Sequence, residues 1–358
     1  MTARTRTLAT ALAMTLALVA CGSDDSDDGA DRSGADPVTL RLLTHDSFAL
    51  SDGVLDAFTD ETGIRVELLQ GGDAGTVVNQ AILTKGNPQA DVLFGIDSTF
   101  LSRALDEDLF VPYEADGLDE VDERLRLDPQ HRVTPIDYGD VCLNYDRAWF
   151  EEAGIPAPSS LEELTDPAYR DLLVVENPAT SSPGLAFLLA TVEAFGDDGW
   201  QAWWADLQAN GVEVTGGWEE AYYGSFSGGS GSEGTRPLVV SYASSPAAEL
   251  IYADPPIEES PIGVIDASCY RQVEGAGILS GTDHEAEAGQ LIDFLLSPEV
   301  QADVPLSMFV YPVRSGVELD PVFVEHAVAP GDVHELPPDQ IGERREEWID
   351  EWTTIVLG

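Results

Sequence analysis

Two short patterns in the sequence could support chemistry by themselves. The adjacent phenols Tyr222 and Tyr223 could hold a ferric ion, because two neighbouring phenolates are good ligands for it. The segment from Gly229 to Gly234 has the Gly-x-Gly-x-x-Gly spacing of dinucleotide-binding loops. That site needs a strand before it and a helix after it, whereas no strand pattern leads in and Pro237 begins an apolar strand pattern. We therefore interpret Gly229 to Gly234 as a flexible surface loop.

Other catalytic and metal-binding patterns are absent from the sequence. There is no Cys-x-x-Cys, His-Glu-x-x-His, Walker loop or Gly-x-Ser-x-Gly elbow. Asp and Glu are so frequent that close carboxylate pairs arise by chance. The five histidines lack the spacing of metal ligands and lie at His45, His131, His284, His326 and His334. We predict no catalytic residue, no metal site and no cofactor, which leaves binding as the default and a secreted hydrolase as an alternative without an identifiable nucleophile.

The composition excludes one class of partner. The 358 residues contain 17 Lys and Arg against 66 Asp and Glu, for a formal net charge of −49 at pH 7. Nucleic-acid binders need clustered Lys and Arg, so we expect no nucleic-acid partner. Hydrophobic residues make up 43% of the chain, enough for a sizeable core, and the length suggests about two domains or one two-lobed unit.

The amino terminus indicates export. Arg4 and Arg6 precede an apolar run, Leu8 to Ala20, that is too short to span a bilayer. We interpret residues 1–20 as a signal peptide. Cys21 follows this run directly, as in the lipobox of bacterial lipoproteins, and is the predicted lipidation site. Residues 21–36 are polar and acidic and would form a tether, so we expect the body to be held at the outer face of the cytoplasmic membrane by a lipid anchor alone.

The remaining chain alternates strand and helix patterns. Strands are expected at 38–43, 64–69 and 91–95 with helices between them, an order that favours a parallel sheet. Two further strand patterns, 136–146 and 262–272, would carry the chain between lobes. We predict an α/β fold with lobe 1 at 37–140 plus 268–358 and lobe 2 at 141–267. Cys142 and Cys269 fall in the crossing segments and could form a disulfide, or remain reduced.

Several segments resemble the thiamine-binding proteins of bacterial ABC importers, in the same order over most of the chain. The resemblance implies the two-lobed fold of periplasmic binding proteins (type II), with the ligand between the lobes. It also implies a monomer that captures thiamine or its phosphate esters and delivers it to permease subunits. Ferric-iron binders share the fold and are the alternative. The matching segments are 44–48, 91–97, 136–139, 178–184, 217–222, 241–246 and 311–313.

The resemblance implies a set of ligand-binding positions. Where the family tends to have Tyr and Trp, this chain has His45 and Phe309, which keep flat rings but weaken the expected stacking. The implied positions are His45, Asp46, Asp73, Ala74, Ser181, Ser182, Trp218, Tyr222, Tyr242, Ser244, Ser245 and Phe309.

These residue types suit thiamine, a flat organic cation. Trp218, Tyr242 and Phe309 would offer aromatic faces, each contributing roughly 0.5–2 kcal/mol of attraction to a cation. Asp46 and Asp73 would accept from the aminopyrimidine or balance the charge. The serines would hold the hydroxyethyl end or a phosphate on it. The competing interpretation is that the aspartates and serines only cap turns and helices.

Overall fold

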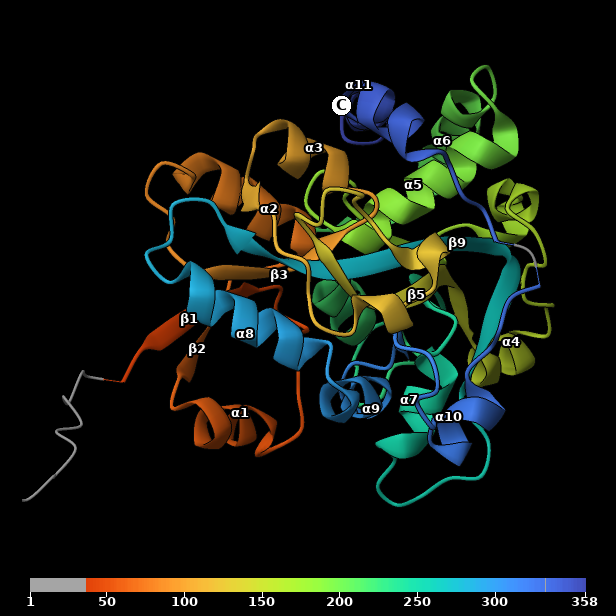
Figure 1. Cartoon of the computed structure of the whole chain (residues 1–358). Coiled ribbons are helices and arrows are strands. Elements are labelled where there is room, and N and C mark those ends of the chain that lie inside the picture. Colours follow the sequence, from red (N-terminus) through yellow and green to blue (C-terminus); the bar gives the residue numbers. More distant parts are fainter. Residues whose placement is uncertain (1–36, 332) are drawn as a thin grey trace, which may run out of the picture. The chain divides into compact units, whose positions relative to one another are not determined.

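The computed structural model describes residues 37–331 and 333–358, which form ten strands of one mixed sheet with helices on both faces (Figure 1). The predicted signal peptide, Cys21 and the tether lie outside the described residues. Within those that are described, no helix is both long enough and apolar enough to cross a membrane.

One group of strands is parallel, as the alternating pattern predicted. β1 (Thr39–Thr44) pairs with both β2 (Arg65–Gln70) and β3 (Val92–Asp97). The strands β1 and β3 are largely apolar because helices cover both faces of the sheet there. A second group contains β8 (Leu238–Tyr242), β6 (Leu173–Glu176) and β7 (Glu213–Thr215), in which β6 pairs in parallel with each of the others.

Two long antiparallel strands join these groups. β5 (Thr134–Asp146) and β9 (Ile262–Leu279) pair along most of their length. β9 also pairs with β3, and β5 with β8, so each long strand borders one of the parallel groups. The sulfur atoms of Cys142 in β5 and Cys269 in β9 form a disulfide between the two long strands.

The short strands β4 (Phe110–Val111) and β10 (Tyr311–Pro312) pair with β9 and β5 respectively. The proposed lobe boundaries remain a prediction.

Helices build one hydrophobic core on each face of the sheet. In Figure 1, α3, α5, α6 and α11 lie above β9, and α1, α8 and α9 lie below it. The tryptophans of α6 and α11 belong to the upper core, where the rings of Trp204 and Trp352 meet edge to face at 5.5 Å. The α-helices are α1 (Val54–Thr62), α2 (Ala74–Thr84), α3 (Leu101–Asp106), α4 (Arg147–Ala153), α5 (Ser182–Phe195), α6 (Trp200–Ala209), α7 (Ser245–Ile251), α8 (Glu285–Leu295), α9 (Pro298–Ser307), α10 (Pro321–His326) and α11 (Pro338–Val356).

The helices that matter for the site begin at identifiable caps. Asp73 caps α2, and Ser181 caps α5 by accepting a hydrogen bond from Gly184 N at 3.3 Å. Pro183 in the first turn of α5 fits because the first N–H groups of a helix need no partner within it.

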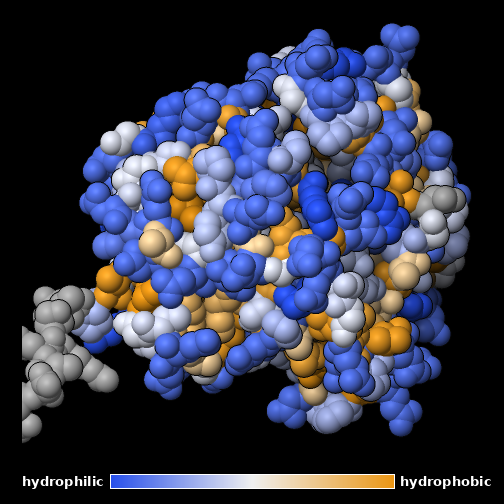
Figure 2. All heavy atoms as spheres, in the orientation of Figure 1, coloured by the Kyte–Doolittle hydropathy of each residue, from blue (hydrophilic) through white to orange (hydrophobic). Residues whose placement is uncertain are grey.

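The surface in Figure 2 is mostly hydrophilic, as the acidic composition requires.

Candidate ligand-binding cavity

A cavity opens where strands from both parallel groups end. It is lined at one side by residues that follow β1 and β2, and at the other by residues that follow β6, β7 and β8. Loops at the carboxyl ends of parallel strands are where open α/β sheets bind ligands. The long strands β5 and β9 form its floor through Asp137, Gly139, Gln272 and Glu274.

The cavity brings together nearly all of the residues implied as ligand-binding by the family resemblance. Ser181 is the exception: it is fully buried, and its hydroxyl caps α5 instead of lining the cavity. The lining residues among the implied positions are His45, Asp46, Asp73, Ala74, Ser182, Trp218, Tyr222, Tyr242, Ser244, Ser245 and Phe309.

Aromatic rings form one wall. Trp218 stacks on Tyr222 with ring centroids 5.0 Å apart and planes inclined by 23°. The indole is fixed further by Nε1, which donates to Ser241 Oγ at 2.9 Å. Tyr242 meets Trp218 edge to face at 6.5 Å. Tyr222 and Tyr223 follow Trp218 in a short π-helical turn, Glu220–Ser225, and the ring of Tyr223 meets that of Trp218 at 5.5 Å.

A second aromatic pair lies on the solvent side of the cavity. Phe309, between α9 and β10, meets Tyr252, at the end of α7, with centroids 4.9 Å apart. Both rings line the cavity, and Tyr252 is 63% exposed. Phe309 has φ of 58°, a left-handed conformation unusual for a residue other than glycine. The segment between α9 and β10 therefore contacts the end of α7 through these rings.

Asp73 connects three separate segments. Its Oδ1 accepts from Ala74 N at 2.7 Å and from Ser182 N at 3.1 Å, and its Oδ2 accepts from Trp218 N at 2.9 Å. Gly217 permits this approach, because a Cβ there would come within 3.0 Å of Asp73 Cβ. Burial raises the pKa of Asp73, and the hydrogen bonds from Trp218 and Ser182 partly oppose that rise. The carboxylate that was a candidate ligand contact thus holds the N-termini of α2 and α5 beside Trp218.

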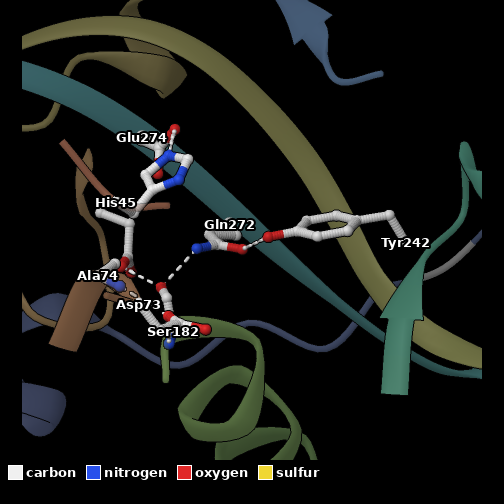
Figure 3. Close-up of polar contacts among 8 residues, drawn as sticks. His45, Asp73, Ala74, Ser182, Tyr242, Gln272 and Glu274 are labelled. Carbon is white, nitrogen blue, oxygen red and sulfur yellow. Dashed lines mark hydrogen bonds and ion pairs between the residues drawn. The ribbon is translucent and has the colours of Figure 1, made fainter. Parts of the chain in front are cut away.

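A polar chain crosses the floor of the cavity. Tyr242 Oη donates to Gln272 Oε1 at 3.1 Å, and Gln272 Nε2 donates to Ser182 Oγ at 2.5 Å. The Ser182 hydroxyl in turn donates to Asp97. Figure 3 shows Gln272 between Tyr242 and Ser182. Side chains from β8, β9, α5 and β3 are fixed by this one chain of hydrogen bonds.

The serines at the start of α7 are also engaged. Ser245 Oγ lies 3.0 Å from Ser241 Oγ and accepts from Tyr242 N at 3.3 Å. Ser244 and Ser245 are both buried. Because Ser241 also accepts from Trp218, these hydroxyls support the aromatic wall as well as lining the cavity.

Carboxylates gather at the inner end of the cavity. Asp137 and Glu274 face each other in register on β5 and β9, and Asp137 is 2% exposed. Burial, and then the neighbouring Glu274, raise the pKa of Asp137 well above its usual range. Burial also raises the pKa of Asp97 to about 6, despite hydrogen bonds from Ser182 and Thr99. Carboxyl groups that lie this close together and are shielded from water oppose each other's ionisation.

His45 borders these carboxylates. Its Nε2 lies 3.4 Å from Glu274 Oε2 (Figure 3). Burial alone would lower the pKa of His45, but the charge of Glu274, its hydrogen bond to the ring, and the charges of Asp73 and Asp46 outweigh burial and raise it. Among the described residues that line the cavity, none is Lys or Arg. The cavity is therefore aromatic and acidic, which suits a flat cation.

Several polar and aromatic lining residues were missed by sequence reasoning. Asp137, Gln272 and Glu274 lie inside strands, where polar residues at alternate positions of an apolar segment were the available signal. Tyr252 had no signal in the sequence pattern. Glu249, on α7, accepts from Tyr222 Oη at 2.7 Å and from Ser230 N at 3.1 Å.

The structure also bears on the two chemical patterns considered first. Ser230 belongs to the glycine-rich segment, which is a loop followed by β8 and not by a helix, so the dinucleotide site is excluded there. Burial and Glu249 raise the pKa of the Tyr222 phenol well above its usual range, so a phenolate there is disfavoured. No group of three or more His, Cys, Asp or Glu side chains that could hold a metal occurs within residues 37–331 and 333–358.

Comparison with known proteins identifies the family. Residues 87–341 match the family described as bacterial extracellular solute-binding protein. The thiamine-binding periplasmic protein of Salmonella typhimurium is 31% identical over 333 residues, covering 90% of this chain and 94% of the relative. The protein of the same name from Escherichia coli is 31% identical over 332 residues, with the same coverage.

Solved structures of periplasmic binding proteins have the same fold as this chain. A periplasmic thiamin binding protein superposes with a TM-score of 0.78 at 28% identity, covering 89% of this chain and 96% of that one. Iron-bound HitA from Pseudomonas aeruginosa superposes with a TM-score of 0.70 at 24% identity, covering 89% and 99%, and shows the fold alone. The predicted α/β fold of two-lobed periplasmic binding proteins is confirmed. The chain belongs to the family of bacterial extracellular solute-binding proteins.

Proposed function

We propose that this protein captures thiamine outside the cytoplasmic membrane and delivers it to the permease of an ABC importer. The observation that carries this proposal is the cavity itself, which combines the Trp218 and Tyr242 rings with the buried Asp137 and the half-buried Glu274 and has no lining Lys or Arg among its described residues. Aromatic faces attract a flat cation, and carboxylates balance its charge. Two relatives named for thiamine binding align over 90% of the chain.

The geometry of the lining residues supports the following roles. The thiazolium and aminopyrimidine rings would lie against Trp218, Tyr242 and Phe309, and the acidic inner end would balance the positive charge. Asp46 and the serines of α7 remain candidates for polar contacts to the ligand. Asp73 and Ser181 would act by positioning the wall, because their side-chain oxygens already accept backbone hydrogen bonds.

The cellular setting is part of the proposal. Residues 1–20 would direct export, and Cys21 would carry the lipid that holds the protein at the outer face of the membrane. We propose that it acts as a monomer and performs no reaction on its ligand.

Titration of the intrinsic tryptophan fluorescence tests the proposal. Thiamine, thiamine monophosphate, thiamine diphosphate and ferric citrate are titrated side by side. We expect saturable quenching by thiamine, because Trp218 lines the cavity. Saturation by ferric citrate alone would instead support the iron-binding alternative, and release of inorganic phosphate from the monophosphate would indicate a hydrolase.

A further inference from the structure

Two side chains that can carry opposite charges, His45 and Glu274, lie together at the inner end of the cavity. The family resemblance gives Glu274 no role. Glu274 projects from β9 into the cavity, and its side chain is 14% exposed. His45, also 14% exposed, is the one lining residue within the described chain that can carry a positive charge. The His45 and Glu274 side chains form a partly buried pair at 3.4 Å.

The backbone beneath His45 directs its ring toward Glu274. A Cβ at Gly95 would lie 2.7 Å from His45 Cδ2, so only glycine lets the imidazole lie against β3 at this point. The ring also contacts Phe94, with centroids 5.7 Å apart. These contacts hold one edge of the imidazole against the sheet and leave Nε2 beside the carboxylate of Glu274.

The charged groups around His45 are all acidic. Glu274 lies on β9, Asp73 precedes α2, Asp46 is on the same loop as His45, and Glu219 precedes the π-helical turn. Asp137 faces Glu274 from β5. A cationic imidazole is therefore the group that offsets this negative charge when no ligand is bound. A cationic ligand at the inner end would offset the same charge, so the two cations compete for Glu274.

We propose that Glu274 recognises the positive charge of the ligand and that His45 is its partner in the ligand-free protein, so that entry of the cation releases the His45 proton to solvent. This inference rests on the proposed function, because it takes thiamine as the cation. Glu274 then determines specificity for charged over neutral rings. Binding weakens as the pH falls, since the proton on His45 must be removed for the ligand to take its place.

Calorimetry in buffers of different ionisation enthalpy measures the number of protons that are released when the ligand binds. Between about pH 6 and about pH 9, we expect thiamine binding to release up to about one proton. Replacing His45 by Gln keeps an amide donor near Glu274 but cannot titrate. His45→Gln should therefore abolish the proton release and make the dissociation constant nearly independent of pH over this range.

The Glu274→Gln variant tests charge recognition. It should bind thiamine at least about tenfold more weakly than the wild type. The neutral probe is 3-deazathiamine, in which a thiophene replaces the thiazolium. The wild type should prefer thiamine to this probe, and Glu274→Gln should lose most of that preference. Thermal unfolding checks that each variant is folded. If Glu274→Gln does not fold, the His45→Gln variant alone tests the predicted proton release.

A matched control pair lies outside the cavity. His334 Nδ1 and Glu193 Oε2 are 2.6 Å apart, and neither residue lines the cavity. His334→Gln and Glu193→Gln should leave both affinity and proton release unchanged.

Two results would overturn the inference. One is thiamine binding without proton release by the wild type. The other is release that persists in His45→Gln, which would assign the proton to Asp137 or Asp97. Failure of the proposed function looks different, because the wild type would then show no thiamine binding at any pH.

Discussion

The backbone N–H of Trp218 donates to Asp73 Oδ2 at 2.9 Å, so the wall of the cavity that follows β7 is fixed by a carboxylate that follows β2. The same carboxylate accepts from the first residues of α2 and α5. The position of the indole is therefore determined by the junction of three segments, and not by its own helical turn alone.

Replacing Asp73 by Asn tests this junction. An amide nitrogen cannot accept the hydrogen bonds that one carboxylate oxygen accepts now, so at least one buried backbone N–H loses its partner. We expect the free energy of unfolding to fall by about 1–3 kcal/mol, with weaker thiamine binding. Urea unfolding measures the loss, and Asp52→Asn at an exposed position is the control. A stability change below about 0.5 kcal/mol would show that Asp73 does not hold the junction.

Trp218 provides a second prediction. Removing its ring in Trp218→Ala should weaken thiamine binding at least about tenfold, or about 1.4 kcal/mol, because the ligand loses an aromatic face. Trp218→Phe keeps a ring but loses the hydrogen bond to Ser241, so its affinity should lie between those of the alanine variant and the wild type. Calorimetry measures both. If Trp218→Ala binds as tightly as the wild type, the indole makes no contact with the ligand.

Tyr252 and Phe309 predict an effect on the rate of ligand release. Their rings meet 4.9 Å apart, both line the cavity, and Tyr252 is 63% exposed to solvent. Tyr252→Ala should raise the dissociation rate of thiamine several-fold and leave the association rate nearly unchanged, because most changes in affinity between related complexes arise from the dissociation rate. Stopped-flow fluorescence separates the two rates.

A double variant tests whether the two rings act together. If they form one contact, Tyr252→Ala combined with Phe309→Ala should speed release less than the product of the two single effects. Independent, multiplicative effects would instead mean that each ring contacts the ligand separately.

Much of the fold could be predicted from local patterns. The strands expected at 38–43, 64–69 and 91–95 correspond to β1, β2 and β3, because buried strands are short apolar runs. The expected strand 262–272 extends in the structure to Leu279 as β9. The extension was missed because Gly275 and Gly277 interrupt the apolar pattern. A Cβ at these positions would lie 2.4 Å from Thr134 O and 2.5 Å from Phe110 Cδ1, so neighbouring strands require the glycines.

The site was less predictable, because its polar residues depend on distant partners. Asp73 could be assigned from sequence either to a cap or to the ligand, and only the arrangement of α5 and Trp218 around it shows three backbone donors. Glu274 looked like any other acid in a chain with 66 Asp and Glu. Its place in the cavity follows from the pairing of β9 with β5, which sets residues far apart in the sequence side by side.

Asp97 predicts how stability depends on pH. Its pKa of about 6 in the folded protein exceeds the ordinary value of 3.8 because burial disfavours the charge. Between these two pH values the folded state binds more protons than the unfolded state, so the free energy of unfolding falls as the pH rises. The difference between 3.8 and about 6 corresponds to about 3 kcal/mol, present below about pH 4 and lost above about pH 6.

The Asp97→Asn variant isolates this contribution. Asparagine cannot ionise, so the variant lacks the decline due to Asp97, whereas surface repulsion among the other acids is common to both proteins. The stability of the wild type relative to the variant should fall by about 3 kcal/mol between about pH 3 and about pH 7. Urea unfolding at several pH values measures that difference. A difference that stays constant or grows with pH would mean that Asp97 ionises as readily in the folded protein as in the unfolded chain, and that Ser182 and Thr99 solvate its charge fully.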